Sequence, residues 1–276
     1  MDDDGVPTNK DQLSEAIKSA IERQRAFEDR RATRLGRGAE GLTAPLAGLL
    51  SRLIPPALAR QALHQADWAA GLTVPQEITG HDVQSIAACD KAAMRVQAWA
   101  QGSNAATGGA AGWFGAAGLA LDVPATIALA ARNVRATGAA YGFVEDDENE
   151  RTFRLMVLEV ATALATDRRA DSIENLNALA REMNRPEVRM VLDHGAKWMT
   201  EKVIERLARQ LGLSLAGRKA GQVIPVLGSA VGATVNASFQ VDVSRAARYA
   251  YRQRWLMARQ ALPAPEAATT AEPEDA

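Results

Sequence analysis

The sequence predicts an all-α fold: a multi-helix bundle with two glycine-rich helices packed closely at its centre. Three observations lead to this fold class. Aromatic residues make up only 5% of the 276 residues, and the abundant Ala and Leu favour helix over strand. No convincing stretch alternates apolar and polar residues with a period of two. Two uncharged segments, 105–121 and 220–241, place small residues at helical spacing.

Small residues recur at regular intervals in both uncharged segments. The first has a glycine at every third position and the second a small residue at every fourth: Gly109, Gly112, Gly115 and Gly118, then Gly228, Gly232 and Asn236. Glycine costs a helix interior about 1 kcal/mol relative to alanine, so these runs need a compensating contact. Small residues let helix backbones approach closely. We therefore expect the two segments to pack on each other, with Asp122 and Asn236 as polar partners near the crossing.

Composition and charge limit the possible functions. The net charge of −1 gives no global attraction to nucleic acid, and the single cysteine excludes an intramolecular disulfide. The sequence opens with MDDDG, so we expect no signal peptide and a cytoplasmic location, peripheral on the inner face of the membrane. The segment at 105–121 is short and consists largely of Gly and Ala, and the segment at 220–241 carries several polar residues, so neither suits an ordinary membrane-spanning helix. We expect them to be buried or interfacial.

The first half of the chain begins with a charged leader at 1–40. We expect this leader to be helical or disordered; its narrow apolar stripe would suit an exposed helix that docks weakly or on a partner. An apolar helical domain is expected over 41–262, and the prolines at 55 and 56 separate its first two helices. A loop at 71–80 and a helix at 82–101 follow. Asp122 is expected to cap a helix that begins at Pro124.

The second half of the chain contains further amphipathic segments. The acidic turn at 145–150 suits the positive end of a helix that follows it to residue 164. Helices are also predicted over 171–183 and 186–211, and a basic helix over 242–260 follows the second glycine segment. The tail at 263–276 carries Pro, Ala and acidic residues without periodicity, so we expect it to be disordered.

No motif in the sequence predicts catalysis, a metal site or a cofactor. The three histidines lie in separate segments without the HExxH spacing of a zinc site. Neither glycine-rich segment contains the GxGxxG or the GxxxxGK[ST] phosphate-binding pattern, and no predicted strand precedes either one. We therefore predict no catalytic residues, no metal and no cofactor.

A set of polar residues lies in or beside the apolar helices: Asp122, Arg132, Tyr141, Asp147 and Arg151. A buried carboxylate needs a cation or hydrogen-bond donors, so we expect a buried polar network that fixes the helix register. The alternative is a peptidase-like hydrolase that uses this cluster around Asp122 for acid-base chemistry.

The last helix carries an arginine stripe, in which Trp255 accompanies four basic residues at steps of three and four: Arg245, Arg248, Arg252 and Arg259. Arginine combined with aromatic residues suits an anionic membrane surface. A solvated face that pairs with acidic residues of the same chain, such as those at 145–150, is the other interpretation. The stripe is too short and the net charge too low for a nucleic-acid interface.

Two blocks of the sequence resemble the EcsC family. The first is ATGGAAGWFGAAGLALDVPATIALAARNVRATGAAYGF at 105–143, followed by EDDENERTFRLMVLEVA; the second is IPVLGSAVGATVNASFQVDVSRAARYAYRQRWL at 224–256. The resemblance covers roughly residues 42–260. The family is named after a gene beside a bacterial ABC transporter, and its biochemical function is not established.

The resemblance and the residues together predict a non-enzymatic, membrane-peripheral accessory or interaction protein. The resemblance implies a link to transporter or envelope function. A membrane surface or a membrane protein is the expected partner, while the oligomeric state stays open. The hydrolase and a protein–protein module built on the helix at 1–40 are the alternatives.

Overall fold

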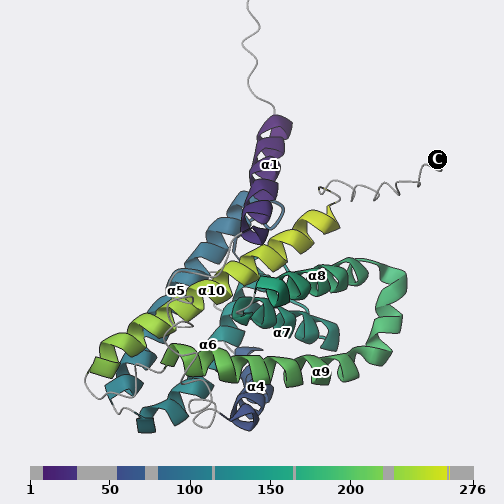
Figure 1. Cartoon of the computed structure of the whole chain (residues 1–276). Helices are drawn as coiled ribbons and strands as arrows, with labels where there is room; N and C mark the ends of the chain where they lie inside the picture. Colours follow the sequence, from purple (N-terminus) through teal and green to yellow (C-terminus); the bar gives the residue numbers. More distant parts are fainter. Residues whose placement is uncertain are drawn as a thin grey trace, which may run out of the picture.

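The computed structural model describes residues 9–29, 55–71, 80–113, 116–163, 166–219, 227–259 and 261. Within these ranges every regular element is an α-helix (Figure 1). The helices are α1 (Asn9–Glu28), α4 (Pro56–Gly71), α5 (Ile86–Trp113), α6 (Ala116–Ala140), α7 (Glu148–Thr162), α8 (Thr166–Met183), α9 (Pro186–Lys219) and α10 (Leu227–Ala258). The predicted all-α bundle is therefore confirmed.

Helices α5, α6 and α10 form the centre of the bundle. The two long helices α5 and α10 run antiparallel along each other (Figure 1), because Asn104 bonds Asn236 while Asp90, earlier on α5, bonds Arg252, later on α10. Helix α6 packs against both, and α4 and α9 cover the other side of the bundle through contacts with α6 and α7. The helices predicted around 82–101 and 242–260 are thus parts of longer ones.

The predicted contact between the two glycine segments lies only partly within the described residues. Asn236 is buried and accepts a hydrogen bond from Asn104 of α5, and Gly109 is half-buried. The surroundings of the other glycines fall outside the described residues: Gly112 of α5, Gly115, Gly118 of α6, and Gly228 and Gly232 of α10. Helices α5 and α10 do pack together, but the glycine contact itself stays a prediction.

The expected helix start at Pro124 is wrong. Helix α6 begins at Ala116 and continues through Pro124, so Asp122 lies inside the helix and is not its cap. A proline in a helix interior removes one backbone hydrogen bond. Here Val123 and Ile127, on either side of the proline, are fully buried, so tertiary packing maintains the helix despite that loss.

Helix α1 docks on its own chain. It projects from the bundle in Figure 1, and its C-terminal part lies against α5 and α10. Gln24 is buried and donates from its amide to the carbonyl oxygen of Tyr249 at 2.9 Å. The ring of Phe27 stacks on that of Tyr249 with centroids 4.6 Å apart. Ala20 of the leader's apolar stripe is buried, and Ile17 and Ile21 pack against the core, so the stripe is used within the chain.

The chain ends and the first predicted apolar helix fall outside the described residues. These are residues 1–8 and 30–54 and the tail at 263–276. Among the described helices, none combines the length and the apolar character that crossing a bilayer requires.

Candidate functional site

A ladder of buried polar side chains connects α5, α6 and α10. The amide of Asn236 donates to Asp122 Oδ1 at 2.9 Å, and the amide of Asn104 donates to the Asn236 carbonyl oxygen at 3.0 Å. Further along, Asn133 donates to Gln240 Oε1 at 2.9 Å and to Ser244 Oγ at 2.8 Å. Asp122 is only 2% exposed. This ladder fixes the helix register, because misaligned helices would leave these groups unsatisfied.

The other residues expected in the polar network lie elsewhere in the bundle. The guanidinium of Arg132 stands over the Trp99 ring at 4.1 Å. Tyr141 donates to Asp90 of α5, and burial raises the pKa of this phenol above its ordinary value. These two contacts are made with Trp99 and Asp90 of α5, and not with the polar groups described around Asp122.

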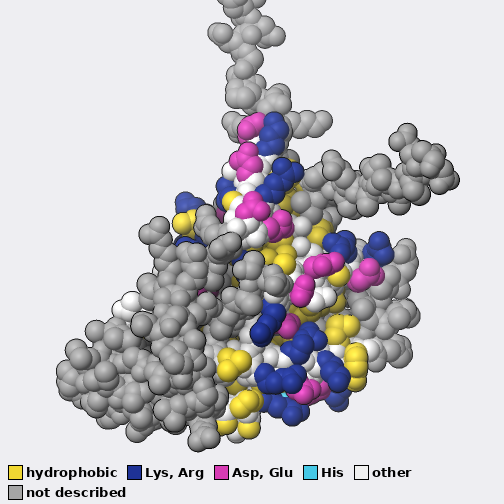
Figure 2. All heavy atoms as spheres, viewed as in Figure 1, with side chains coloured by type: hydrophobic (Ala, Val, Ile, Leu, Met, Phe, Trp, Pro, Cys, Tyr) yellow, Lys and Arg dark blue, Asp and Glu magenta, His cyan; other side chains and the backbone are white. Residues whose placement is uncertain are grey.

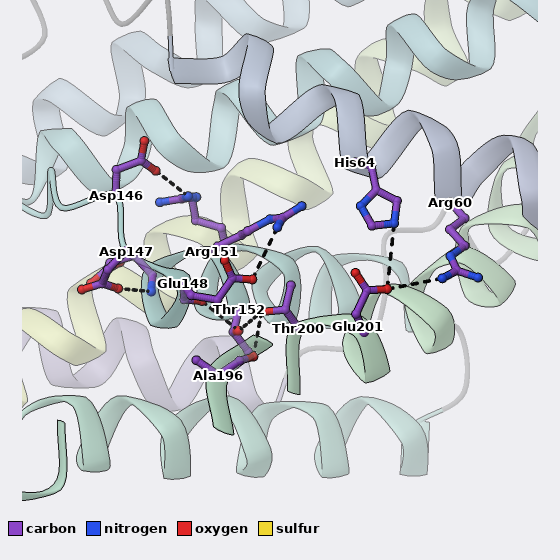
Figure 3. A network of polar contacts seen from close by, with 12 residues as sticks. Arg60, His64, Asp146, Asp147, Glu148, Arg151, Thr152, Ala196, Thr200 and Glu201 are labelled. Atoms are coloured by element: carbon purple, nitrogen blue, oxygen red, sulfur yellow. Dashed lines mark hydrogen bonds and ion pairs between the residues drawn. The ribbon is translucent and has the colours of Figure 1, made fainter. Parts of the chain in front are cut away.

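Asp147 and Arg151 lie together at the start of α7 (Figure 3). Asp147 is the N-cap of this helix, since its carboxylate accepts from the Glu150 backbone N–H at 2.8 Å. Arg151 pairs with Glu148 at 3.4 Å. Nearby, Thr152 of α7 and Thr200 of α9 share a hydrogen bond, and Glu201 faces Arg60 and His64 of α4. The contacts in this region hold α4, α7 and α9 together.

The arginine stripe of α10 does not form a single surface face. Trp255 is 1% exposed and donates from Nε1 to the Val83 carbonyl oxygen at 2.9 Å. Arg252 is also buried. The prediction that these two residues lie on the surface is wrong, because α1 and the segment before α5 cover this side of α10. Arg259 stacks over the Trp255 ring at 3.8 Å and bonds Gln84, while Arg245 and Arg248 are half-buried.

A buried ion pair was not predicted from the sequence. Arg254 of α10 donates to both oxygens of Glu150, at 2.9 and 2.6 Å, between the rings of Phe143 and Phe153. The sequence pattern indicates pairing between α10 and the acidic turn at 145–150, but through the arginines of the stripe and not through Arg254.

The candidate site is a pocket of about 220 Å³ between α1 and α10. Four of its lining residues are arginines, one from α1 and three from the α10 stripe: Arg23, Arg245, Arg248 and Arg252. The stacked rings of Phe27 and Tyr249, with Ala26, form the apolar part of the wall. The docking of α1 thus adds Arg23 to the three stripe arginines that line the pocket.

Two of the four arginines are tied to Asp90. Arg252 donates to Asp90 Oδ1 from Nη2 at 2.7 Å and from Nε at 3.0 Å. Arg23 donates to Asp90 Oδ2 at 3.0 Å. The remaining nitrogen of Arg252, Nη1, bonds Gln24 Oε1 at 3.1 Å. One carboxylate therefore serves two guanidinium groups and holds both in place.

The other two arginines are available to a ligand. Within the described ranges, neither Arg245 nor Arg248 forms a hydrogen bond or an ion pair through its guanidinium. Burial lowers the pKa of Arg248 below its ordinary value; the positive charges of Arg252 and Arg245 act in the same direction, and Tyr141 and Asp90 act in the opposite one. Burying a charge without a partner is costly, so the pocket has an excess of positive charge that an anion would relieve.

This arrangement is suited to binding an oxyanion. Guanidinium groups present planar, paired donors that match the oxygens of a phosphate or a carboxylate. The volume is below the 300–1,000 Å³ or so of sites for drug-sized ligands, so a small anionic group fits better than a large one. The sequence pattern predicted the α10 arginines, but it contained no signal for Arg23, Phe27 or Asp90. Arg23 and Phe27 line the pocket only because α1 docks on α10, and Asp90 of α5 holds two of its arginines.

Comparison with known proteins identifies the family. The model of the EcsC protein family matches residues 15–256. The match begins within α1, so it extends further toward the N-terminus than the resemblance seen in the sequence, and it includes both walls of the pocket. The chain has no significant match among the curated proteins or the solved structures. Because the matched region covers most of its length, the chain belongs to the EcsC protein family.

Proposed function

We propose that this protein is a non-enzymatic, membrane-peripheral accessory protein that binds the phosphate of an anionic phospholipid head group in the pocket between α1 and α10. One observation carries the proposal: Arg245 and Arg248 line the pocket without an anionic partner among the described residues. A phosphate diester supplies the missing charge and accepts paired hydrogen bonds from both guanidinium groups.

A lipid head group suits the pocket better than a free anion because of the apolar part of its wall. The wall formed by Phe27 and Tyr249 offers an apolar surface beside the charged one, as the junction of a head group and its acyl chains requires. A link to a transporter or to the envelope would follow from a position at the membrane surface.

The hydrolase alternative has little support from the geometry. It required Asp122 to meet another titratable group in an open pocket. The Asp122 carboxylate instead lies in the contact between α6 and α10, where the Asn236 amide and the Thr126 hydroxyl bond it.

Vesicle sedimentation tests the proposal. The full chain is incubated with vesicles of phosphatidylglycerol in phosphatidylcholine, and with pure phosphatidylcholine as the uncharged control. We expect binding only to the anionic vesicles and a loss of about 100-fold in affinity for the double variant Arg245→Gln, Arg248→Gln, at roughly tenfold per charge-assisted contact.

The control variant removes the same charge elsewhere. Arg168 and Arg181 are exposed on α8, so Arg168→Gln, Arg181→Gln changes the net charge equally and leaves the pocket intact. Equal loss in both double variants would mean that only overall charge matters, and would contradict the proposal. Displacement of the vesicles by millimolar inorganic phosphate, at constant ionic strength, would identify a soluble anion as the ligand in place of the lipid.

A further inference from the structure

The outer face of α5 combines exposed basic, apolar and small residues. It consists of Lys91, Met94, Arg95, Ala98, Trp99 and Gly102, which recur at steps of three and one and therefore lie on one side of the helix. Met94 is 61% exposed and Trp99 is 38% exposed. Helices α10, α6 and α1 contact α5 elsewhere on its surface and leave this face open.

The outer face of α5 carries positive charge without acidic residues. The only acidic residue of α5 is Asp90, and its carboxylate is turned away to Arg252, Arg23 and Tyr141. Lys91 and Arg95 are both exposed. Arg132 of α6 adds a third cation at the edge of the face, above the Trp99 ring.

A second exposed tryptophan differs from Trp99 in having acidic residues close by on its own helix. Trp198 of α9 is 68% exposed and has Lys202 over its ring at 5.6 Å, but Glu201 and Glu205 follow it on the same helix. Figure 2 shows the side of the molecule that carries α4 and α9, where basic and acidic side chains are interspersed. That surface mixes both signs of charge, whereas the outer face of α5 has no acidic residue.

We infer that the outer face of α5 is the surface on which the protein rests against an anionic bilayer, with Trp99 and Met94 at the depth of the head groups. The inference rests on the membrane association proposed above and names its contact surface. Basic residues are attracted to the anionic layer, while the indole ring and the thioether enter the interface. Gly102 has open space around it, so the helix backbone itself can approach the lipid closely.

A site-specific fluorescent probe tests the contact. In a Cys89→Ala background, Ala98→Cys is labelled with an environment-sensitive nitrobenzoxadiazole group, and Asn175→Cys on α8 serves as the matched exposed control. We expect anionic vesicles to increase and blue-shift the emission of the probe at 98 and to leave the probe at 175 unchanged. Equal responses at both positions, or none at 98 while the protein sediments with the vesicles, would overturn the inference.

A charge variant separates this surface from the pocket. Lys91→Gln, Arg95→Gln is expected to lower the vesicle partition coefficient roughly 5-fold per residue removed. If the pocket variant loses binding while the α5 variant binds as wild type does, the inference fails and the proposed function stands. If the pocket variant binds anionic vesicles with undiminished affinity and its probe at 98 still responds, the α5 surface is supported and the pocket assignment fails. Absence of any vesicle binding by the wild-type chain overturns both.

Discussion

The buried pair between Arg254 and Glu150 is expected to be a major contributor to the stability of the bundle. The exposed fractions of the two side chains are 6% and 3%, and two hydrogen bonds of 2.9 and 2.6 Å join them. Replacing either partner leaves the other charge buried without compensation. Arg254→Met or Glu150→Leu alone should therefore lower the free energy of unfolding by about 3–5 kcal/mol.

The double variant should recover most of this loss. With both charges removed, no uncompensated ion remains, and the new side chains can pack between Phe143 and Phe153. Replacing a whole buried pair by apolar residues is often close to neutral. We expect the double variant to lose less than about 2 kcal/mol, which gives a coupling energy of roughly 4 kcal/mol or more between the two positions.

Urea unfolding followed by circular dichroism at 222 nm measures the four free energies of this cycle. The exposed pair Arg185–Glu182 provides the control, because its side chains are 61% and 39% exposed. The control cycle, with Arg185→Met and Glu182→Leu, should give a coupling below about 1 kcal/mol. Equal coupling in the two cycles would refute the reasoning that burial determines the strength of the pair.

Further predictions concern glycines, the lone thiol and α1. A Cβ at Gly138 would lie 2.7 Å from the ring of the buried Tyr251, so Gly138→Ala should lower the free energy of unfolding by about 1–2 kcal/mol even after the gain in helix propensity. Gly102 has open space around it, so Gly102→Ala should raise the free energy of unfolding by up to about 1 kcal/mol. Urea unfolding of the two variants measures the opposite signs. Burial raises the pKa of Cys89 from 9.0 to about 11, so the native thiol should resist Ellman's reagent at pH 8 and react only on unfolding. Because the folded state holds this proton more tightly, stability should fall as pH rises from about 9 to 11, and the fall should be smaller in Cys89→Ala. Deleting residues 1–28 should remove Arg23 and Phe27 from the pocket and weaken binding to anionic vesicles.

The sequence predicted most of the helices because their signals are local. Apolar spacing, the acidic turn before α7 and the proline at the start of α9 all act within one or two turns of helix. The error at Pro124 arose because a local rule was applied to a position that tertiary packing controls. Val123 and Ile127 are buried in the core, and the local sequence pattern does not show how strongly this packing stabilises the helix around the proline.

The candidate site could be predicted only in part. The spacing on α10 located Arg245 and Arg248, but spacing alone could not tell which arginines face water and which face another helix. That depends on α1, whose Gln24 and Phe27 dock more than two hundred residues away along the chain. The apolar stripe of the leader indicates that the helix docks, but its spacing does not show which distant helix it docks on.

The most direct test of the central claim is calorimetric titration of the full chain with monomeric dihexanoyl phosphatidylglycerol, a short-chain anionic lipid that needs no bilayer. We predict saturable binding of one molecule per chain that is lost in Arg245→Gln, Arg248→Gln and retained in Arg168→Gln, Arg181→Gln. Binding of the same strength in both double variants, or no binding by the wild-type chain, would contradict the claim that the arginine-lined pocket between α1 and α10 receives an anionic head group.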